Sequence, residues 1–347
     1  MSTREGLPSE LLDDPLLRHV PVMEGFKVLE PCVLYFKLGQ GGMGRTYMAE
    51  DMERFNELCV LKEFIPFSSS PESIKKSKEL FQREASILYQ VKHPQIPEFR
   101  ATFEASDRLF LVQDYVEGQT FRDILIERLK HKSVFSEGEV VELLRQVLPI
   151  LAYLHNRHII HRDISPENLM LRLSDRLPVL IDFGVVKETA TKLLAHSHLA
   201  TVVGKLGYAP PEQMQSGRAY PNSDLYALAA TIVVLLTGKE PQELFDDISL
   251  SWHWMQYAAV SDPMKQVLNK MLSFKSGDRY SNAQEVLFAL ELAQASNSQA
   301  KTFAVGGQVI FNSGNSGIIS GSGSRSSLNP NTNNVYAPNP SLQIPQK

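Results

Sequence analysis

Three side chains near the middle of the chain have the types and the order that phosphoryl transfer requires. Asp163 and Asn168 lie five residues apart in HRDISPEN, and Asp182 begins Asp-Phe-Gly directly after the apolar run Val179–Ile181. Transfer of a phosphoryl group to a hydroxyl needs a base for the nucleophile and oxygen ligands for magnesium. Asp163 suits the first task, and Asn168 and Asp182 suit the second. Each tripeptide alone is common, so the interpretation depends on the rest of the chain.

An upstream glycine-rich segment, Gly39-Gln-Gly41-Gly-Met-Gly44, matches the pattern G-x-G-x-x-G. In a dinucleotide-binding unit this pattern lies between a strand and a helix. Here β-like residues lie on both sides, at Val33–Leu38 and Thr46–Ala49, and a third strand is expected over Leu58–Phe64. The segment is therefore predicted to bend a β-hairpin, as in kinase phosphate-binding loops. A flexible turn is the alternative for the motif taken alone.

Lys62 and Glu84 form the next candidate pair. Lys62 lies in the third expected strand, and a helix is expected over Ile74–Val91, ended by His93-Pro94. Glu84 falls inside the apolar stripe of that helix, where a carboxylate is costly unless a cation pairs with it. We expect a Lys62–Glu84 ion pair that places the ammonium group against nucleotide phosphates.

The ordered set of these charged and polar residues resembles that of the protein kinases over roughly residues 30 to 295. The phrases GQGGMGRTYMAED and GYAPPEQ resemble bacterial Hanks-type (eukaryotic-like) serine/threonine kinases, including cyanobacterial ones. The resemblance implies an α+β, bilobal fold: a small β-rich N-lobe with one helix, about 29–116, and a larger, mainly helical C-lobe, about 117–295. It also implies ATP and Mg²⁺ between the lobes, and a protein substrate with a Ser or Thr acceptor.

The resemblance assigns roles around this cleft. The hinge would lie at Asp114-Tyr115-Val116, whose backbone would meet adenine, with Gln113 as gatekeeper. Thr46 and Val60 replace the family's usual Val and Ala and should still cover the adenine face. The residues expected at the ATP site are Leu38, Gly39, Gln40, Gly41, Gly42, Met43, Gly44, Arg45, Thr46, Val60, Lys62, Glu84, Asp114 and Val116.

Further implied roles are structural. Pro210-Pro211-Glu212 occupies the family's Ala-Pro-Glu position, and Glu212 would pair with Arg279. Asp224 would begin a buried helix and brace the catalytic loop.

The segment between Asp182 and Glu212 is the expected site of regulation. Arg162, beside the catalytic aspartate, would pair with a phosphate on this segment and order it. Thr201 and Ser197 are the favoured autophosphorylation sites.

One departure from the family pattern lies in the catalytic loop. Serine/threonine kinases usually carry Lys two residues after the catalytic aspartate, where this chain has Ser165, and they carry Thr where this chain has Lys205. Loss of a charge that contacts the transferring phosphate costs on the order of a hundredfold to a thousandfold in rate. Our hypothesis is an exchange, in which Lys205 supplies the ammonium group and Ser165 the hydroxyl. The alternative is two independent losses, with Lys205 in solvent.

Two other functional classes stay open. A pseudokinase, a nucleotide-binding scaffold with little catalysis, is favoured by Ser165 and Lys205 and opposed by the intact Lys62, Asp163 and Asp182. A small-molecule phosphotransferase is disfavoured by GYAPPEQ, which resembles a protein-substrate platform.

Composition excludes several alternatives. The chain has 347 residues, a net charge of −4 and 43% hydrophobic residues, typical of a soluble globular protein without the basic excess that nucleic-acid binding requires. Cys32 and Cys59 have no paired spacing, which argues against a disulfide framework or a zinc site and fits a reducing cytosol. No membrane-spanning run or signal peptide is evident, so a cytoplasmic protein is expected.

Composition also predicts the domain boundaries. Residues 1–28 are polar and form a lead-in, and residues 29–295 form the kinase-like domain. Residues 296–347 are rich in Ser, Asn, Gly and Pro and are expected to be a disordered tail.

Overall fold

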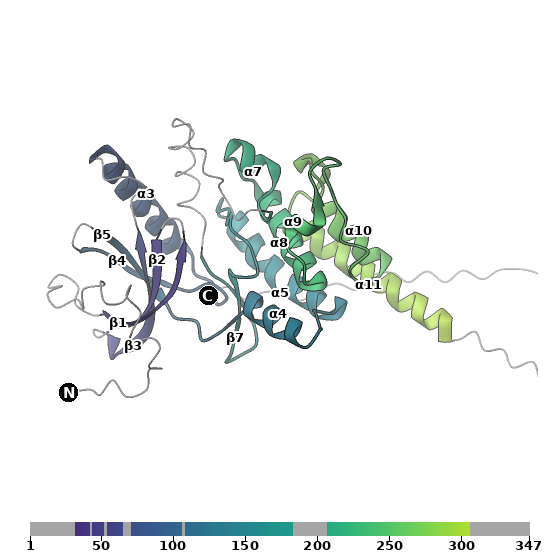
Figure 1. Cartoon of the computed structure of the whole chain (residues 1–347), viewed down its shortest axis with the longest axis horizontal. Coiled ribbons are helices and arrows are strands. Elements are labelled where there is room, and N and C mark those ends of the chain that lie inside the picture. The colour runs from purple at the N-terminus through teal and green to yellow at the C-terminus, as the bar shows by residue number, and fades with distance from the viewer. Residues whose placement is uncertain are drawn as a thin grey trace, which may run out of the picture. The chain divides into compact units, whose positions relative to one another are not determined.

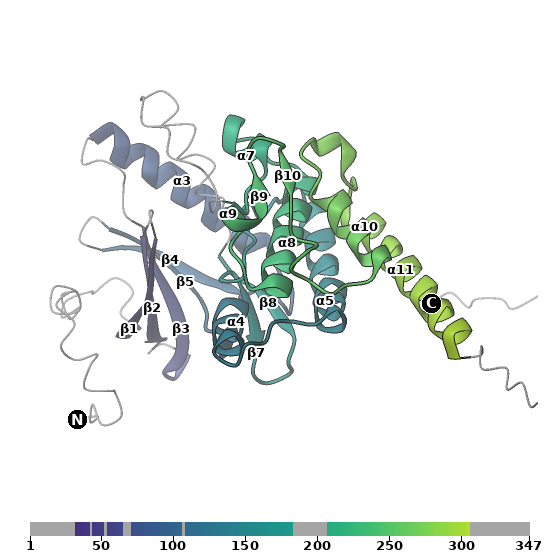
Figure 2. The same cartoon turned by 45° about the vertical axis from the view of Figure 1, so that its right-hand side comes forward.

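A computed structural model of the chain describes residues 32–41, 44–51, 54–64, 71–105, 108–182 and 207–305. All of the described elements lie within the unit Met1–Phe303 except the end of the last helix (Figures 1 and 2). Some predicted site residues lie outside the described residues, namely Gly42, Met43, Ser197, Thr201 and Lys205.

In its described residues the N-lobe is a five-stranded antiparallel sheet in the order β1-β2-β3-β5-β4, with one helix beside it (Figure 1). Its elements are β1 (Cys32–Gly41), β2 (Gly44–Asp51), β3 (Glu57–Phe64), α3 (Pro71–Gln90), β4 (Phe99–Ala105) and β5 (Arg108–Asp114). The strand and helix positions expected from the sequence are confirmed to within a few residues at each end.

Alternation along β5 explains how this sheet packs. Leu109 and Leu111 belong to a buried cluster that includes Phe81 and Leu88 of α3. Their neighbours Phe110 and Val112 belong to a separate cluster with residues of β2 and β3. Because successive strand residues point to opposite faces, one apolar run supplies both faces of the sheet.

The C-lobe is mainly helical and carries two small antiparallel sheets. Its helices are α4 (Phe121–Lys130), α5 (Glu137–His155), α7 (Pro211–Ser216), α8 (Pro221–Thr237), α9 (Pro241–Leu244), α10 (Asp262–Met271), the 3-10 turn η2 (Ser276–Asp278) and α11 (Ala283–Val305). Its strands are β6 (Gly118–Thr120), β7 (Leu169–Arg172) and β8 (Pro178–Leu180), in the order β6-β7-β8, and the pair β9 (Phe245–Asp246) and β10 (Ser251–Trp252).

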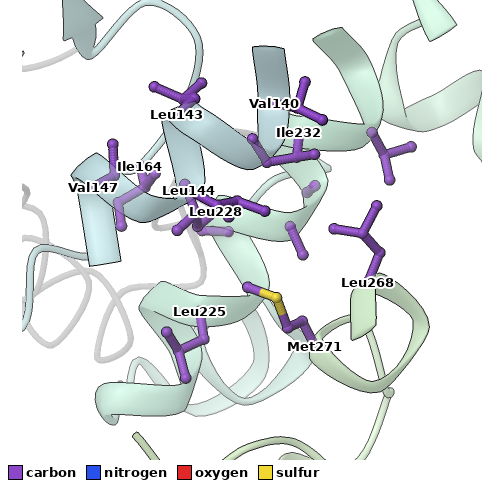
Figure 3. Packing of buried hydrophobic residues seen from close by; sticks show 14 of the residues in the cluster. Val140, Leu143, Leu144, Val147, Ile164, Leu225, Leu228, Ile232, Leu268 and Met271 are labelled. Atoms are coloured by element: carbon purple, nitrogen blue, oxygen red, sulfur yellow. The ribbon is translucent and has the colours of Figure 1, made fainter. Parts of the chain in front are cut away.

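The C-lobe core forms around α8. This helix is apolar on every side, and each residue from Ser223 to Leu236 is buried, which confirms the predicted core helix. Helix α5 packs against it with an apolar stripe, and its first turn is stabilised by a capping box between Ser136 and Glu139. Ile164 of the catalytic loop is fully buried in the same cluster and lies beside α5 residues in Figure 3.

The last helix differs from expectation. Helix α11 continues to Val305, beyond the boundary expected at residue 295. A helix whose first turns pack on a core can extend into a polar segment, because each added residue gains a backbone hydrogen bond without a new nucleation cost. The remainder of the expected tail, residues 306–347, lies outside the described residues. Among the helices that the structure describes, none combines the length and apolar character needed to span a bilayer.

Candidate active site

The glycine segment forms the predicted hairpin. Strands β1 and β2 are antiparallel, with Gly41 opposite Gly44 and Gly39 opposite Thr46. The register continues into β3, where Thr46 lies opposite Lys62. The hairpin therefore places the glycine backbone and the lysine on adjacent strands.

Lys62 of β3 forms an ion pair with Asp182. The lysine comes from the N-lobe sheet and the aspartate from the segment after β8, so this contact bridges the lobes. Glu84 lies on α3, but its side chain is outside the described part of the structure, so its pairing with Lys62 stays a prediction. On the same sheet Val60 lies opposite Gln113, and both are buried.

The β7–β8 hairpin brings the other polar residues together. Leu169, the first residue of β7, pairs with Leu180, the last residue of β8. Asn168 therefore lies beside Ile181, whose backbone N–H donates to the Asn168 carbonyl at 2.9 Å. Asp182 follows directly, so Asn168 and Asp182 leave the same end of the hairpin.

Asn168 also orients the predicted base. Its Nδ2 donates to the Asp163 backbone oxygen at 2.6 Å and to Asp163 Oδ2 at 2.8 Å. Both side chains are buried. Since the amide nitrogen is committed to Asp163, the amide oxygen is the atom of Asn168 that can face a cation.

His161 is a buried link between the catalytic loop and Ile181, the residue before Asp182. Its Nε2 lies 3.1 Å from the Ile181 carbonyl, and its Nδ1 accepts from the Asp163 N–H at 3.4 Å. Neutral imidazole with the proton on Nε2 satisfies both contacts. Burial lowers the pKa of His161 and outweighs the opposing effect of Asp224, so the neutral ring is favoured.

Asp224 holds the loop backbone, as the sequence predicted. Its carboxylate is fully buried and accepts from the N–H groups of His161, at 2.9 Å, and Arg162, at 2.8 Å. It also lies 2.8 Å from His155 Nε2 of α5. Burial alone would raise the pKa of Asp224, but these hydrogen bonds and nearby histidines lower it, so the carboxylate is charged.

Two residues of the site have left-handed backbones. Arg162 has φ 69° and Asp182 has φ 57°. Non-glycine residues in this region cost free energy and persist where the surroundings fix them. Asp224 accepts a hydrogen bond from the Arg162 N–H, and the Asn168 carbonyl accepts one from the Ile181 N–H, so each strained residue has a fixed neighbour.

Ser165 lies inside this loop, where its side chain is almost fully buried. Within the described residues, its Oγ has no hydrogen-bond partner. A buried hydroxyl without a partner costs about 1–3 kcal/mol, so the position needs an additional polar neighbour. The predicted partner, Lys205, lies outside the described residues.

The predicted Glu212–Arg279 ion pair is present. Arg279 Nη1 lies 2.7 Å from Glu212 Oε1, and the arginine side chain is fully buried. Ser223 donates to the same carboxylate at 2.7 Å. Burial favours the neutral acid, but the hydrogen bonds from Arg279 and Ser223 outweigh it and lower the pKa of Glu212. Arg162, predicted to bind a phosphate, donates to the Gly217 carbonyl at 3.3 Å.

The sequence reasoning missed an arginine beside the catalytic loop. Arg122 of α4 donates from Nε to Glu167 at 2.7 Å, from Nη1 to Glu240 at 2.6 Å and from Nη2 to the Tyr208 hydroxyl at 2.8 Å. Glu167 was visible in HRDISPEN, but its partners are distant in sequence. Periodicity and local motifs carry no signal for such a contact.

A cavity of about 570 Å³ is lined by residues 91–94, 96–98 and 114–117 together with Arg172, Ser174 and Val179. Its charged groups pair with neighbours, as Arg172 does with Asp175 and Asp114 does with Arg100. The predicted hinge residues Asp114 and Val116 therefore border this cavity, whose lining does not include Asp163, Asn168 or Asp182.

Sequence comparison then decides the family. The protein kinase domain family matches residues 33–289, which is most of the chain. The chain belongs to the protein kinase family.

Two curated relatives of this kinase domain come from cyanobacteria. It is 40% identical over 264 residues to serine/threonine-protein kinase B of Synechocystis sp., covering 74% of this chain and 45% of the relative. It is 39% identical to serine/threonine-protein kinase PknA of Nostoc sp., covering 75% of this chain and 46% of the relative. The aligned part of this kinase thus spans less than half the length of both relatives.

Solved structures support the bilobal fold of the kinase domain. The PpkA-294 apo form is similar with a TM-score of 0.63 at 23% identity, covering 75% of this chain and 96% of that chain. The Mycobacterium tuberculosis PknI kinase domain is similar with a TM-score of 0.60 at 25% identity, covering 76% and 97%. The α+β, bilobal prediction is confirmed.

The donor set of the kinase cleft fits magnesium. The Asn168 amide oxygen and the Asp182 carboxylate leave one end of the β7–β8 hairpin, and both are hard oxygen ligands. Among the described residues, no cluster of three or more His, Cys, Asp and Glu side chains could hold a metal ion. Magnesium usually takes one or two protein ligands and completes its shell with phosphates and water, so two ligands suffice.

Proposed function

We propose that the protein is an ATP- and Mg²⁺-dependent serine/threonine protein kinase. The observation that supports this most directly is the hydrogen bond of Asn168 to Asp163, at the hairpin end that also carries Asp182. Lys62 reaches the same point from the N-lobe through its ion pair with Asp182. A base, two oxygen ligands for magnesium and a phosphate-binding cation are thereby grouped in one cleft.

Each residue has a task in the proposed reaction. Asp163 Oδ2, held by Asn168, accepts the proton of the substrate hydroxyl, and Lys62 binds ATP phosphates from the sheet above. Asn168 and Asp182 would hold Mg²⁺, which neutralises phosphate charge when bound. The glycine hairpin covers the phosphates with backbone N–H groups, and Val60 and the hinge enclose the adenine.

We further propose that Lys205 replaces the lysine that the catalytic loop lacks. Ser165 is buried beside the base, and its hydroxyl has no partner among the residues that the structure describes. An ammonium group from the segment 183–206 would bind this oxygen and face the transferring phosphate. The site would then still contain one ammonium group and one hydroxyl, but the ammonium group would come from position 205 and the hydroxyl from position 165.

Incubation of the protein with labelled ATP, Mg²⁺ and casein tests the kinase assignment. Asp182→Asn and Asp163→Asn should each lower label transfer at least about a hundredfold, because they remove a metal ligand and the base. The matched control is Asp262→Asn on α10, whose side chain is 85% exposed, and it should retain transfer.

A pseudokinase predicts a different result. Nucleotide would bind, but wild type and Asp182→Asn would transfer equally little label to casein or to the protein itself. That outcome would reject the enzyme and favour a nucleotide-binding scaffold.

The exchange has its own test in Ser165→Lys, Lys205→Ala and the double variant Ser165→Lys/Lys205→Thr. Lys205→Ala should lower transfer by about a hundredfold to a thousandfold. The double variant should recover activity that Ser165→Lys alone loses, because two cations in one site repel. Full activity of Lys205→Ala would exclude the exchange.

Regulation by phosphorylation of the activation segment is the remaining proposal. Arg162 lies beside Asp163, and Thr201 or Ser197 would carry the phosphate that it binds. Phosphopeptide mapping of active protein checks this, and an unmodified segment in fully active protein would reject it.

A further inference from the structure

Arg122 joins separate parts of the chain around the catalytic loop. Its side chain is only 16% exposed and bonds to Glu167 of the loop, Glu240 before α9 and Tyr208 after the undescribed segment 183–206. Its backbone N–H also donates to the Pro166 carbonyl at 3.0 Å. The guanidinium fork thus holds three side chains that are remote in sequence.

The Tyr208 side of this network is tightly fixed. Tyr208 is 2% exposed, and burial raises the pKa of its hydroxyl well above the usual range, so the neutral phenol accepts from Arg122. Gly207 has φ 86°, and a Cβ there would lie 2.5 Å from Pro241 Cβ. A side chain at position 207 would therefore clash with Pro241 of α9, and Tyr208 is buried against Arg122.

The Glu167 side reaches the reaction centre. Glu167 lies four residues after Asp163, and the next residue, Asn168, binds Asp163. Burial opposes charge on Arg122, but Tyr208, Glu240 and Glu167 outweigh it and raise the pKa of Arg122. The arginine is therefore charged at any pH at which the fold exists.

We infer that Arg122 is a positioning residue, which fixes the C-terminal end of the activation segment against the catalytic loop. This inference rests on the proposed kinase function. A protein substrate must bring its hydroxyl to Asp163 between these two segments, whereas ATP is held by Lys62, the glycine hairpin and the hinge. Arg122 therefore governs the capture of the protein acceptor and transfer to it, and leaves ATP binding unchanged.

The test compares Arg122→Met, Arg122→Lys and Tyr208→Phe with a control on the same helix, Arg128→Met. Arg128 forms a more exposed ion pair with Glu139, at 2.6 Å. Steady-state kinetics with casein and with ATP are measured for each, together with hydrogen exchange of peptides covering residues 161–169 and 207–214.

Arg122→Met should lower kcat/KM for casein at least about tenfold, because several charge-assisted hydrogen bonds are lost, while KM for ATP changes less than about twofold. Arg122→Lys should retain only part of the wild-type kcat/KM for casein, because an ammonium group cannot reproduce the hydrogen-bond geometry of the planar guanidinium group. Tyr208→Phe should have a smaller effect in the same direction. Hydrogen exchange should rise in both segments for Arg122→Met and stay at the wild-type level for Arg128→Met.

Two outcomes overturn the inference: casein kinetics of Arg122→Met equal to those of Arg128→Met, or exchange that rises equally over the whole C-lobe. Failure of the proposed function looks different. There the wild type transfers no phosphate to casein or to itself, yet Arg122→Met still raises exchange in the two segments. That result supports the positioning role and rejects the kinase.

Discussion

The ion pairs Arg279–Glu212 and Lys62–Asp182 join the same kinds of charge in different surroundings. The Arg279 side chain is fully buried and also donates to the carbonyls of Ser273 and Phe274. Lys62 and Asp182 have side chains 22% and 41% exposed and belong to different lobes. A buried charge must keep its partner, whereas an exposed one can exchange its partner for a ligand at little cost.

We therefore expect the Arg279–Glu212 pair to contribute to stability and the Lys62–Asp182 pair to contribute to catalysis. The C-lobe pair is part of the framework that carries Asp224 and the catalytic loop. In the proposed kinase, the Lys62–Asp182 pair would open when ATP binds. Lys62 would then bind phosphate, and Asp182 would bind magnesium.

Arg279→Met gives the largest expected effect. It leaves the half-buried Glu212 without its cation, so the free energy of unfolding should fall by about 3 kcal/mol. Urea denaturation measures this, with Lys265→Met as the control, because the exposed Lys265–Asp262 pair should contribute less than about 1 kcal/mol. Equal losses in both variants would remove the distinction between buried and exposed pairs.

Lys62→Met should lower the catalytic rate and leave the stability of the fold almost unchanged. We expect phosphate transfer to fall by about a hundredfold to a thousandfold, while the free energy of unfolding changes by less than about 1 kcal/mol. Transfer assays and urea denaturation of the same preparation check both. A destabilisation as large as that of Arg279→Met would show that the Lys62–Asp182 pair is part of the framework.

His161→Gln should give the smallest effect, visible only as a dependence on pH. The folded-state pKa of His161 lies below its unfolded value of about 6.5. Its contribution to stability is therefore complete above pH 6.5 and is lost as the pH falls from there towards the folded pKa. In that window the wild type should lose up to about 1.4 kcal/mol per pH unit more than His161→Gln.

Carboxylates do not interfere with this measurement. Glu212 and Asp224 have lowered pKa values, so their contributions are lost only below about pH 4.5. His93, whose pKa burial also lowers, titrates in both proteins and cancels in the comparison. Parallel stability curves between pH 5 and 7 would contradict the buried neutral ring.

The sequence predicted what depends on local periodicity and on motif order. Apolar patterns located β1, β2, β3 and α3, and the family resemblance implied the buried helix that begins near Asp224. The positions of Asp163, Asn168 and Asp182 could be inferred because each lies next to an apolar strand or in a known motif. The Glu212–Arg279 pair followed from the family resemblance and not from spacing.

Contacts between distant segments could not be predicted in this way. Arg122 and Glu240 are 118 residues apart and meet only because α4 and the segment before α9 pack beside the same loop. The Lys62–Asp182 contact depends on how the two lobes meet, which no local pattern encodes. Helix α11 extends beyond the domain boundary expected at residue 295. An established helix can continue through polar residues that do not pack on the core.

The burial of Ile164 has a consequence for heat inactivation. This residue separates Asp163 from Ser165 and lies in the same apolar cluster as α5 and α8. The loop therefore has no independent melting step, because releasing it exposes part of the C-lobe core. On heating, we expect the reaction centre to keep its geometry up to the temperature at which the whole C-lobe unfolds, and loss of activity and loss of helix signal to coincide.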